Sequence, residues 1–117
     1  MSRDPATAVI AAAKKGSTDV LILALVDEQE LHGYEIGRLL EQRSGGTLAF
    51  TLAALYETLY RLEERRLVRG RWVERPGQRR RRCYRITAAG RKTLAAHRAD
   101  WARFIAALVA VAGVEPA

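Results

Sequence analysis

Apolar residues recur at helical spacing along the first 43 positions of the chain. They predict a short Ala-rich helix over residues 6–15, a second helix over 18–28 with Ser17 as its N-cap, and a third over 34–43. The second helix is apolar on nearly every side, as in a helix that neighbouring elements bury. Glycines after the first and third of these stretches mark the ends of those helices.

A fourth helix is predicted from its N-cap Thr51 to about Arg66. Leucines three and four residues apart predict its buried side: Leu52, Leu55, Leu59 and Leu62. The other side presents Ala53, Ala54, Tyr56, Glu57, Tyr60 and Arg61. We therefore expect an amphipathic helix whose outward side carries two tyrosines and both signs of charge.

The period of the pattern changes to two after residue 68. The segments RGRWVER (69–75) and RRCYRIT (81–87) alternate as β-strands do, and the turn Pro76-Gly77-Gln78 joins them into a β-hairpin. Trp72 is expected in the hydrophobic core of this hairpin, and residues 76–82 form its tip.

The order of the elements predicts an α+β, mostly α-helical fold. Three consecutive helices followed by a two-stranded hairpin are typical of a winged helix-turn-helix. The last of the three helices, here the one that begins after Thr51, enters a major groove of DNA, and the hairpin is the wing. We expect an N-terminal helix over residues 1–16, the DNA-binding domain over 17–87, and a dimerisation helix with a tail over 88–117.

The charge of the chain is unevenly distributed. The 117 residues carry a net charge of +7, but residues 61–92 alone hold 13 basic and 3 acidic side chains, and the rest of the chain has a net charge of −3. Such segregation indicates a surface that meets a polyanion. The four arginines 79–82 at the hairpin tip are the strongest part of this signal, and a solvated turn is the alternative.

Several segments resemble the PadR family of bacterial transcriptional regulators, in the order of that family. They are DVLILAL (19–25), LHGYEI (31–36), Leu55-Tyr56 through Arg61-Leu62-Glu63, YRITAAG (84–90), and Trp101 with Phe104. The single helix after the hairpin resembles the small subgroup of the family. Two positions depart from the pattern: the family usually has Gly-Thr-Leu-Tyr-Pro where this chain has Ala53-Ala54-Leu55-Tyr56-Glu57, and glycine where it has Arg66.

The winged plan and this resemblance together imply double-stranded DNA as the partner. Tyr56, Tyr60 and Arg61 are placed to hydrogen-bond phosphates or reach base edges, and the alternative for each tyrosine is a packed position under the wing. The candidate DNA contacts are Tyr34, Thr51, Ala53, Ala54, Tyr56, Tyr60, Arg61, Gln78, Arg79, Arg80, Arg81 and Arg82. His32, which precedes the third helix, is expected to be a structural hydrogen-bonding residue, with anion binding as the alternative.

A last, long helix is predicted from the N-cap Thr87 to about Ala112, in which Gly90 costs roughly 1 kcal/mol relative to alanine. Its apolar positions follow a heptad seam: Leu94, His97, Trp101, Phe104, Leu108 and Val111. A lone helix with such a seam predicts a homodimer, and a helix folded back on its own domain is the alternative.

The resemblance also implies an effector. In multidrug-sensing relatives of the small subgroup, a tryptophan that matches Trp101 stacks on flat aromatic ligands at the dimer centre. A small planar hydrophobic molecule at Trp101 and His97 is therefore expected, and an interface filled by these side chains is the alternative.

Catalytic and metal-binding motifs are missing from the sequence. It has no Gly-rich phosphate loop, no HExxH and no G-x-S-x-G, so we expect neither an enzyme nor a cofactor. The lone Cys83 has no histidine at zinc-site spacing, and redox sensing by it is a minor hypothesis because neighbouring arginines lower a thiol pKa. The absence of a long apolar run or a signal peptide predicts a cytoplasmic protein without a membrane partner.

The sequence thus predicts a homodimeric transcriptional repressor that binds a pseudo-palindromic promoter site. A small aromatic effector at the dimer centre would release it. Two alternatives remain: a sequence-tolerant basic nucleic-acid-binding module without an effector, and a protein whose last helix docks on a different partner.

Overall fold

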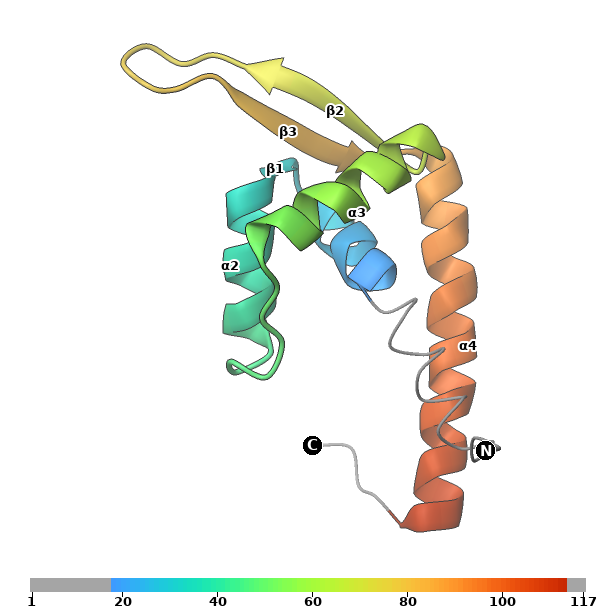
Figure 1. Ribbon diagram of the computed structural model, residues 1–117. Coiled ribbons are helices and arrows are strands. Elements are labelled where there is room, and N and C mark those ends of the chain that lie inside the picture. Colours follow the sequence, from blue (N-terminus) through green and yellow to red (C-terminus); the bar gives the residue numbers. More distant parts are fainter. Residues whose placement is uncertain (1–17, 114–117) are drawn as a thin grey trace, which may run out of the picture.

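The described part of the chain, residues 18–113 of a computed structural model, begins with a helix over residues 18–28 (Figure 1). There follow β1 (Leu31–His32), α2 (Gly33–Arg43), α3 (Leu52–Glu64), β2 (Val68–Val73), β3 (Arg81–Ile86) and α4 (Ala88–Ala112). This order confirms the α+β, mostly helical winged helix-turn-helix. The expected helix over 6–15 and the N-cap Ser17 lie outside the described residues.

The sheet has three antiparallel strands in the order β1-β3-β2. Tyr84 of β3 lies between Leu31 of β1 and Gly70 of β2. The sequence pattern missed β1, because a strand of two residues is too short to show alternation. It also placed the hairpin tip wrongly: Arg81 pairs with Val73 and extends β3, so the tip covers only residues 74–80.

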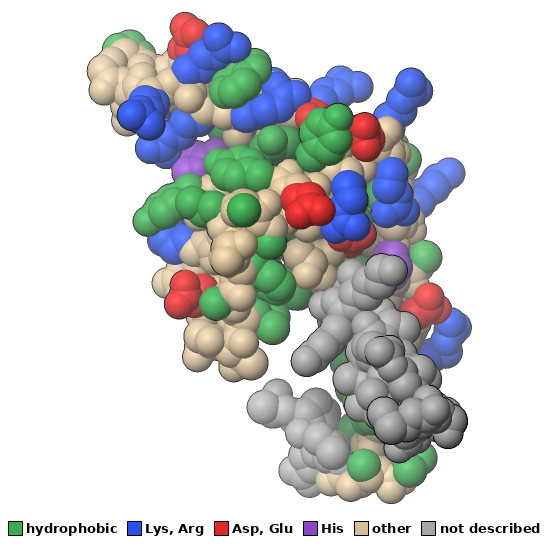
Figure 2. All heavy atoms as spheres, in the orientation of Figure 1, with side chains coloured by type: hydrophobic (Ala, Val, Ile, Leu, Met, Phe, Trp, Pro, Cys, Tyr) green, Lys and Arg blue, Asp and Glu red, His purple; other side chains and the backbone are tan. Residues whose placement is uncertain are grey.

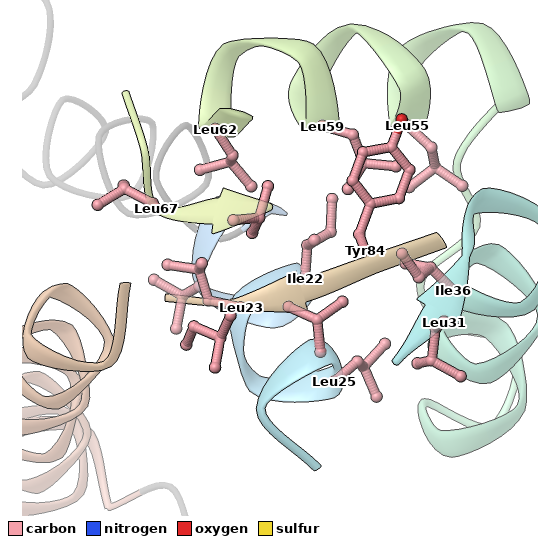
Figure 3. Packing of buried hydrophobic residues seen from close by; sticks show 14 of the residues in the cluster. Ile22, Leu23, Leu25, Leu31, Ile36, Leu55, Leu59, Leu62, Leu67 and Tyr84 are labelled. Carbon is pink, nitrogen blue, oxygen red and sulfur yellow. The ribbon is translucent and has the colours of Figure 1, made fainter. Parts of the chain in front are cut away.

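The hydrophobic core lies between the helix over 18–28, α2, α3 and one face of the sheet (Figure 3). Leu55, Leu59 and Leu62 point from α3 toward Tyr84 and Ile22. The prediction for Leu52 is wrong: this first residue of α3 is 49% exposed, because it lies beside Phe50 at the edge of the core. These contacts fix α3 by its inner side and leave its outer side free.

Short hydrogen bonds define the ends of the helices. Thr51 caps α3 by accepting from the backbone N–H of Ala54 at 3.1 Å, as the sequence predicted. Thr87 caps α4 by accepting from the N–H of Gly90 at 3.0 Å, and its hydroxyl donates to the carbonyl of Arg66 at 2.7 Å. The start of α4 is therefore bonded to the turn that joins α3 to β2.

Two residues at this junction have unusual backbone surroundings. Arg66, where the resemblance leads one to expect glycine, has a φ of 60°, the left-handed conformation that side chains disfavour. Gly90 lies so close to the strand that a Cβ there would stand 2.1 Å from the carbonyl oxygen of Leu67. Gly90 is therefore required by close packing, which the helix propensity considered in the sequence did not reveal.

The C-terminal half of α4 extends past the other helices (Figure 1). Leu94 is buried in the core of its own domain, so its assignment to the dimerisation seam is wrong. The helix over residues 18–28 is within reach of the first turns of α4, where Arg91 bonds Asp27 at 3.0 Å. Along residues 18–113, no helix is both long and apolar enough to cross a membrane.

Candidate nucleic-acid interface

One face of the molecule combines exposed aromatic and basic side chains. Figure 2 shows Lys and Arg side chains over the wing and the C-terminal half of α3, with hydrophobic side chains between them. The aromatic members come from α2, α3 and β2: Tyr34 is 62% exposed, Tyr56 46%, Tyr60 63% and Trp72 54%. Stable domains seldom leave four large aromatic rings half exposed on one side, so this face is suited to a ligand or partner.

A hollow of about 450 Å³ lies where the start of α2, α3 and the wing meet. Its lining is aromatic and basic: His32, Tyr34, Tyr56, Trp72, Arg80, Arg81, Arg82 and Tyr84. The Tyr56 ring is held against α2, because a Cβ at Gly33 would lie only 2.7 Å from that ring. Rings and guanidinium groups in such a hollow match a phosphate-sugar backbone.

The sequence pattern suggested that Trp72 lies in the core of the hairpin, but it belongs to this hollow instead. It lies two residues nearer the tip than Gly70, which is opposite the buried Tyr84, and so beyond the part of the sheet that the core covers. The guanidinium carbons of Arg80 and Arg82 stand 4.4 Å and 5.5 Å from the centroid of the Trp72 ring. These cation–π contacts orient both arginines along the wing.

Glu63 fixes the wing to α3. Arg82 donates to both carboxylate oxygens of Glu63, at 3.0 and 2.7 Å, and the backbone N–H of Gly70 donates to the same group at 3.0 Å. The hydrogen bond to Glu63 raises the pKa of Arg82. Arg82 is therefore a structural clamp, while Arg79 and Arg80 remain on the tip.

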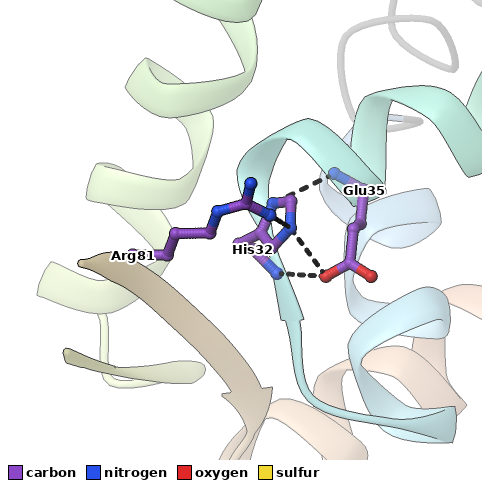
Figure 4. A network of polar contacts seen from close by, with 3 residues as sticks. All are labelled: His32, Glu35 and Arg81. Atoms are coloured by element: carbon purple, nitrogen blue, oxygen red, sulfur yellow. Dashed lines mark hydrogen bonds and ion pairs between the residues drawn. The ribbon is translucent and has the colours of Figure 1, made fainter. Parts of the chain in front are cut away.

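His32 joins the start of α2 to β3 (Figure 4). Its Nδ1 accepts from the backbone N–H of Glu35 at 3.3 Å, and the Glu35 carboxylate accepts from the backbone N–H of His32, which makes a capping box. The Nε2 atom lies 2.6 Å from Nη1 of Arg81 and 3.1 Å from Oε1 of Glu35. The prediction of a structural hydrogen-bonding role for His32 is confirmed.

The charge state of His32 follows from these contacts. Burial lowers the pKa of His32, with further lowering by Arg81 and Arg38 and an opposing effect of Glu35. A neutral imidazole accepts at only one nitrogen. The cap needs a proton-free Nδ1 and the contact with Arg81 needs a proton-free Nε2, so only one of the two can be accepted at a time. Protonation removes the one acceptor of the neutral ring, so neither contact can then be made by accepting at His32.

The other face of the wing is held by Arg71, which donates to the two oxygens of Glu30 at 2.8 and 2.7 Å. That hydrogen bond lowers the pKa of Glu30. Cys83 lies on this face, and burial raises the pKa of its thiol. The raised value runs against the expectation that nearby arginines activate Cys83 as a redox sensor.

The predicted DNA contacts fall into three groups. Tyr34, Tyr56, Arg80, Arg81 and Arg82 meet in the hollow, whereas Thr51, Ala53, Ala54, Tyr60 and Arg61 lie along the exposed side of α3. Arg61 leans toward the helix over 18–28, where its guanidinium is 4.0 Å from Asp19.

Gln78 and Arg79 line a second, polar hollow on the opposite face of the wing. The sequence reasoning missed Trp72 and Glu63. The signal for Glu63 was present, because it is one of only three acidic residues in a strongly basic stretch.

A separate apolar strip runs along the C-terminal half of α4. Of the predicted seam, His97, Trp101 and Phe104 are half-buried, and Leu108 is exposed. Ile105 and Val109, which the heptad reading left out, widen the exposed strip. Residues 18–113 contain no group of three His, Cys, Asp or Glu side chains that could hold a metal ion.

Comparisons with known proteins agree with this fold. The sequence model of the Transcriptional regulator PadR-like family matches residues 22–96. An uncharacterized protein X of Lysinibacillus sphaericus is 30% identical over 88 residues, which are 75% of this chain and 81% of that relative.

Solved structures of similar shape include a transcriptional regulator of Clostridium thermocellum, Cth-833, with a TM-score of 0.77 and 25% identity over 86% of this chain and 94% of that one. Bacillus subtilis PadR in complex with operator DNA has a TM-score of 0.60 and 23% identity, over 71% of this chain and 45% of that one.

Proposed function

The chain belongs to the PadR-like family of DNA-binding transcriptional regulators, and on this premise we propose that it is a homodimeric repressor of a pseudo-palindromic promoter site. The observation that carries the proposal is the single face on which α3, the wing arginines and four exposed aromatic rings meet. In a winged helix-turn-helix this is the face that docks on DNA.

The proposed docking places α3 in a major groove and the wing tip on the neighbouring backbone or minor groove. Tyr60 and the first residues of α3 then face base edges, while Tyr34, Tyr56 and Arg80 surround a phosphate in the hollow between them. The B. subtilis relative, which was solved with operator DNA, supports this assignment through its similar fold.

We propose that the apolar strip of α4 pairs with the same strip of a second subunit. Ile105, Leu108 and Val109 are exposed in the single chain, and a second copy would remove them from water. Two copies related by a two-fold axis present two recognition helices to half-sites about 34 Å apart, or one helical turn of DNA.

An effector between the two α4 helices would act through the junction at Thr87. A small planar hydrophobic molecule that stacks on Trp101, near His97, would change the angle between the helices of the dimer. Thr87 bonds the start of α4 to the carbonyls of Arg66 and Leu67, so this change reaches α3 and the wing. Such a ligand shifts DNA affinity only if it binds the two arrangements unequally.

Binding to DNA tests this function. The protein, which we expect in the cytoplasm where its DNA lies, is titrated against its own upstream region by fluorescence anisotropy, with excess random DNA as competitor. A repressor of the proposed kind retains the specific site at competitor concentrations that abolish random binding. Equal affinity for all sequences would instead identify a sequence-tolerant nucleic-acid-binding module.

Sedimentation at micromolar concentration tests the dimer. We expect a dimer for the wild type and a monomer after Leu108→Lys, which places a charge in the strip without touching the buried core. A monomeric wild type would refute the pairing of α4 and, with it, the proposed route from effector to DNA.

A further inference from the structure

The outward side of α3 has an unexpected charge for a helix that meets DNA. Positions 53, 57, 60 and 64 follow the i, i+4, i+7 and i+11 spacing of one line along a helix, opposite the buried positions 55, 58, 59 and 62. This outward line consists of Ala53, Glu57, Tyr60 and Glu64, all exposed. It contains two carboxylates and no basic side chain.

The neighbouring arginines do not neutralise Glu57. Arg61, one turn further along α3, is directed to Asp19, 4.0 Å away, and to the hydroxyl of Thr58 at 3.4 Å. Arg65 is also directed to Asp19, at 3.7 Å. Within residues 18–113 no ion pair involves Glu57, so its negative charge is not neutralised by a salt bridge to the described residues.

A carboxylate in a major groove is repelled by the phosphates on both sides, and a hydrogen bond accepted from a base can offset that cost. Only the exocyclic amino groups of cytosine and adenine offer donors there, whereas guanine and thymine present acceptors. The adenine amino group is flanked by the N7 acceptor of the same base, which repels a carboxylate. The cytosine amino group has a C–H on that side instead.

We propose that Glu57 reads a cytosine in each half-site by accepting a hydrogen bond from its N4 amino group. Ala53, one turn earlier on the same line, has only a methyl group and accommodates the methyl of a neighbouring thymine. Glu57 thus sets specificity at one base pair, and its charge disfavours random DNA. This inference rests on the proposed function, because it requires α3 to lie in a major groove.

Selection from DNA with randomised half-sites tests the proposal. The wild type, Glu57→Gln and Glu57→Ala are compared after their helical content has been checked by circular dichroism. We expect the wild type to enrich cytosine at one position of each half-site by about tenfold. Glu57→Gln should move the preference at that position to adenine, because a carboxamide pairs with both N6 and N7 of adenine, and Glu57→Ala should abolish it.

Glu41→Gln, near the C-terminal end of α2, is the matched control. It removes the same charge from an exposed helical position away from the outward line, so its base preferences should equal those of the wild type. If the Glu57 variants bind every sequence more tightly with unchanged preferences, Glu57 only repels the backbone and the proposal is overturned. A wild type without any sequence preference would refute the proposed function itself, which is a different outcome.

Discussion

Replacing Gly90 with alanine should destabilise the protein, although alanine is the better helix former. The new Cβ would lie 2.1 Å from the carbonyl oxygen of Leu67 and 2.7 Å from Cγ1 of Ile86. The Leu67 oxygen cannot move freely, because it accepts from the N–H of Thr87 at 3.1 Å. The first turn of α4 must therefore shift away from the strand.

The magnitude follows from three contributions. Overpacking of a close contact costs roughly 1–3 kcal/mol, and loss of the Thr87–Leu67 hydrogen bond adds about 1 kcal/mol. The higher helix propensity of alanine offsets about 1 kcal/mol of this loss in stability. We expect the free energy of unfolding of Gly90→Ala to fall by about 1–3 kcal/mol.

Urea unfolding followed by far-UV circular dichroism measures this change, at one protein concentration because a dimer gains stability by mass action. Ala89→Gly is the control: Ala89 is exposed in the same turn, so glycine there should cost about 1 kcal/mol through propensity alone. A Gly90→Ala variant as stable as the wild type, or more so, would refute the close-packing argument.

Three further predictions concern the cap, the junction and the wing. Because folding lowers the pKa of His32, the unfolded chain takes up the proton first, and the free energy of unfolding should fall as the pH drops from above 6.5 to below it. His32→Asn keeps a capping acceptor and should remove this part of the pH dependence, as urea titrations at several pH values will show. Arg66→Gly relieves a φ of 60° and should raise the melting temperature, with a gain of up to about 1 kcal/mol; an unchanged or lower value would mean that the conformation carries no strain. Replacing Arg79 and Arg80 with alanine should weaken binding to all DNA. The slope of the logarithm of the binding constant against the logarithm of salt concentration should become shallower by about 0.9 for each lost phosphate contact, and an unchanged slope would show that the wing tip is not in the interface.

The sequence pattern predicted every long element of the fold because the apolar residues of those elements follow one period over ten residues or more. Thr51 and Thr87 were recognisable as caps because their role depends on the adjacent residues of the same helix. The strand β1 was not predictable, since its two residues form a strand only by pairing with β3, some fifty positions away.

The candidate site was predicted less well, for a related reason. Trp72 and Leu52 are apolar residues at apolar positions of the pattern, but both lie at the edge of the core, where periodicity does not reveal burial. Among the four consecutive arginines, the pattern could not separate the clamp Arg82 from Arg79 and Arg80, because the difference comes from Glu63 on another element. Pairings between distant segments decided each of these cases.

The bonds of Glu63 have a mechanical consequence. Since one carboxylate joins α3 to both strands of the wing, α3 and the wing are held together as one unit. The close packing of Gly90 on Leu67 lies where the long helix α4 begins, next to the turn between α3 and β2. If α4 rotated about this contact, α3 and the wing would be carried together, without bending of the wing.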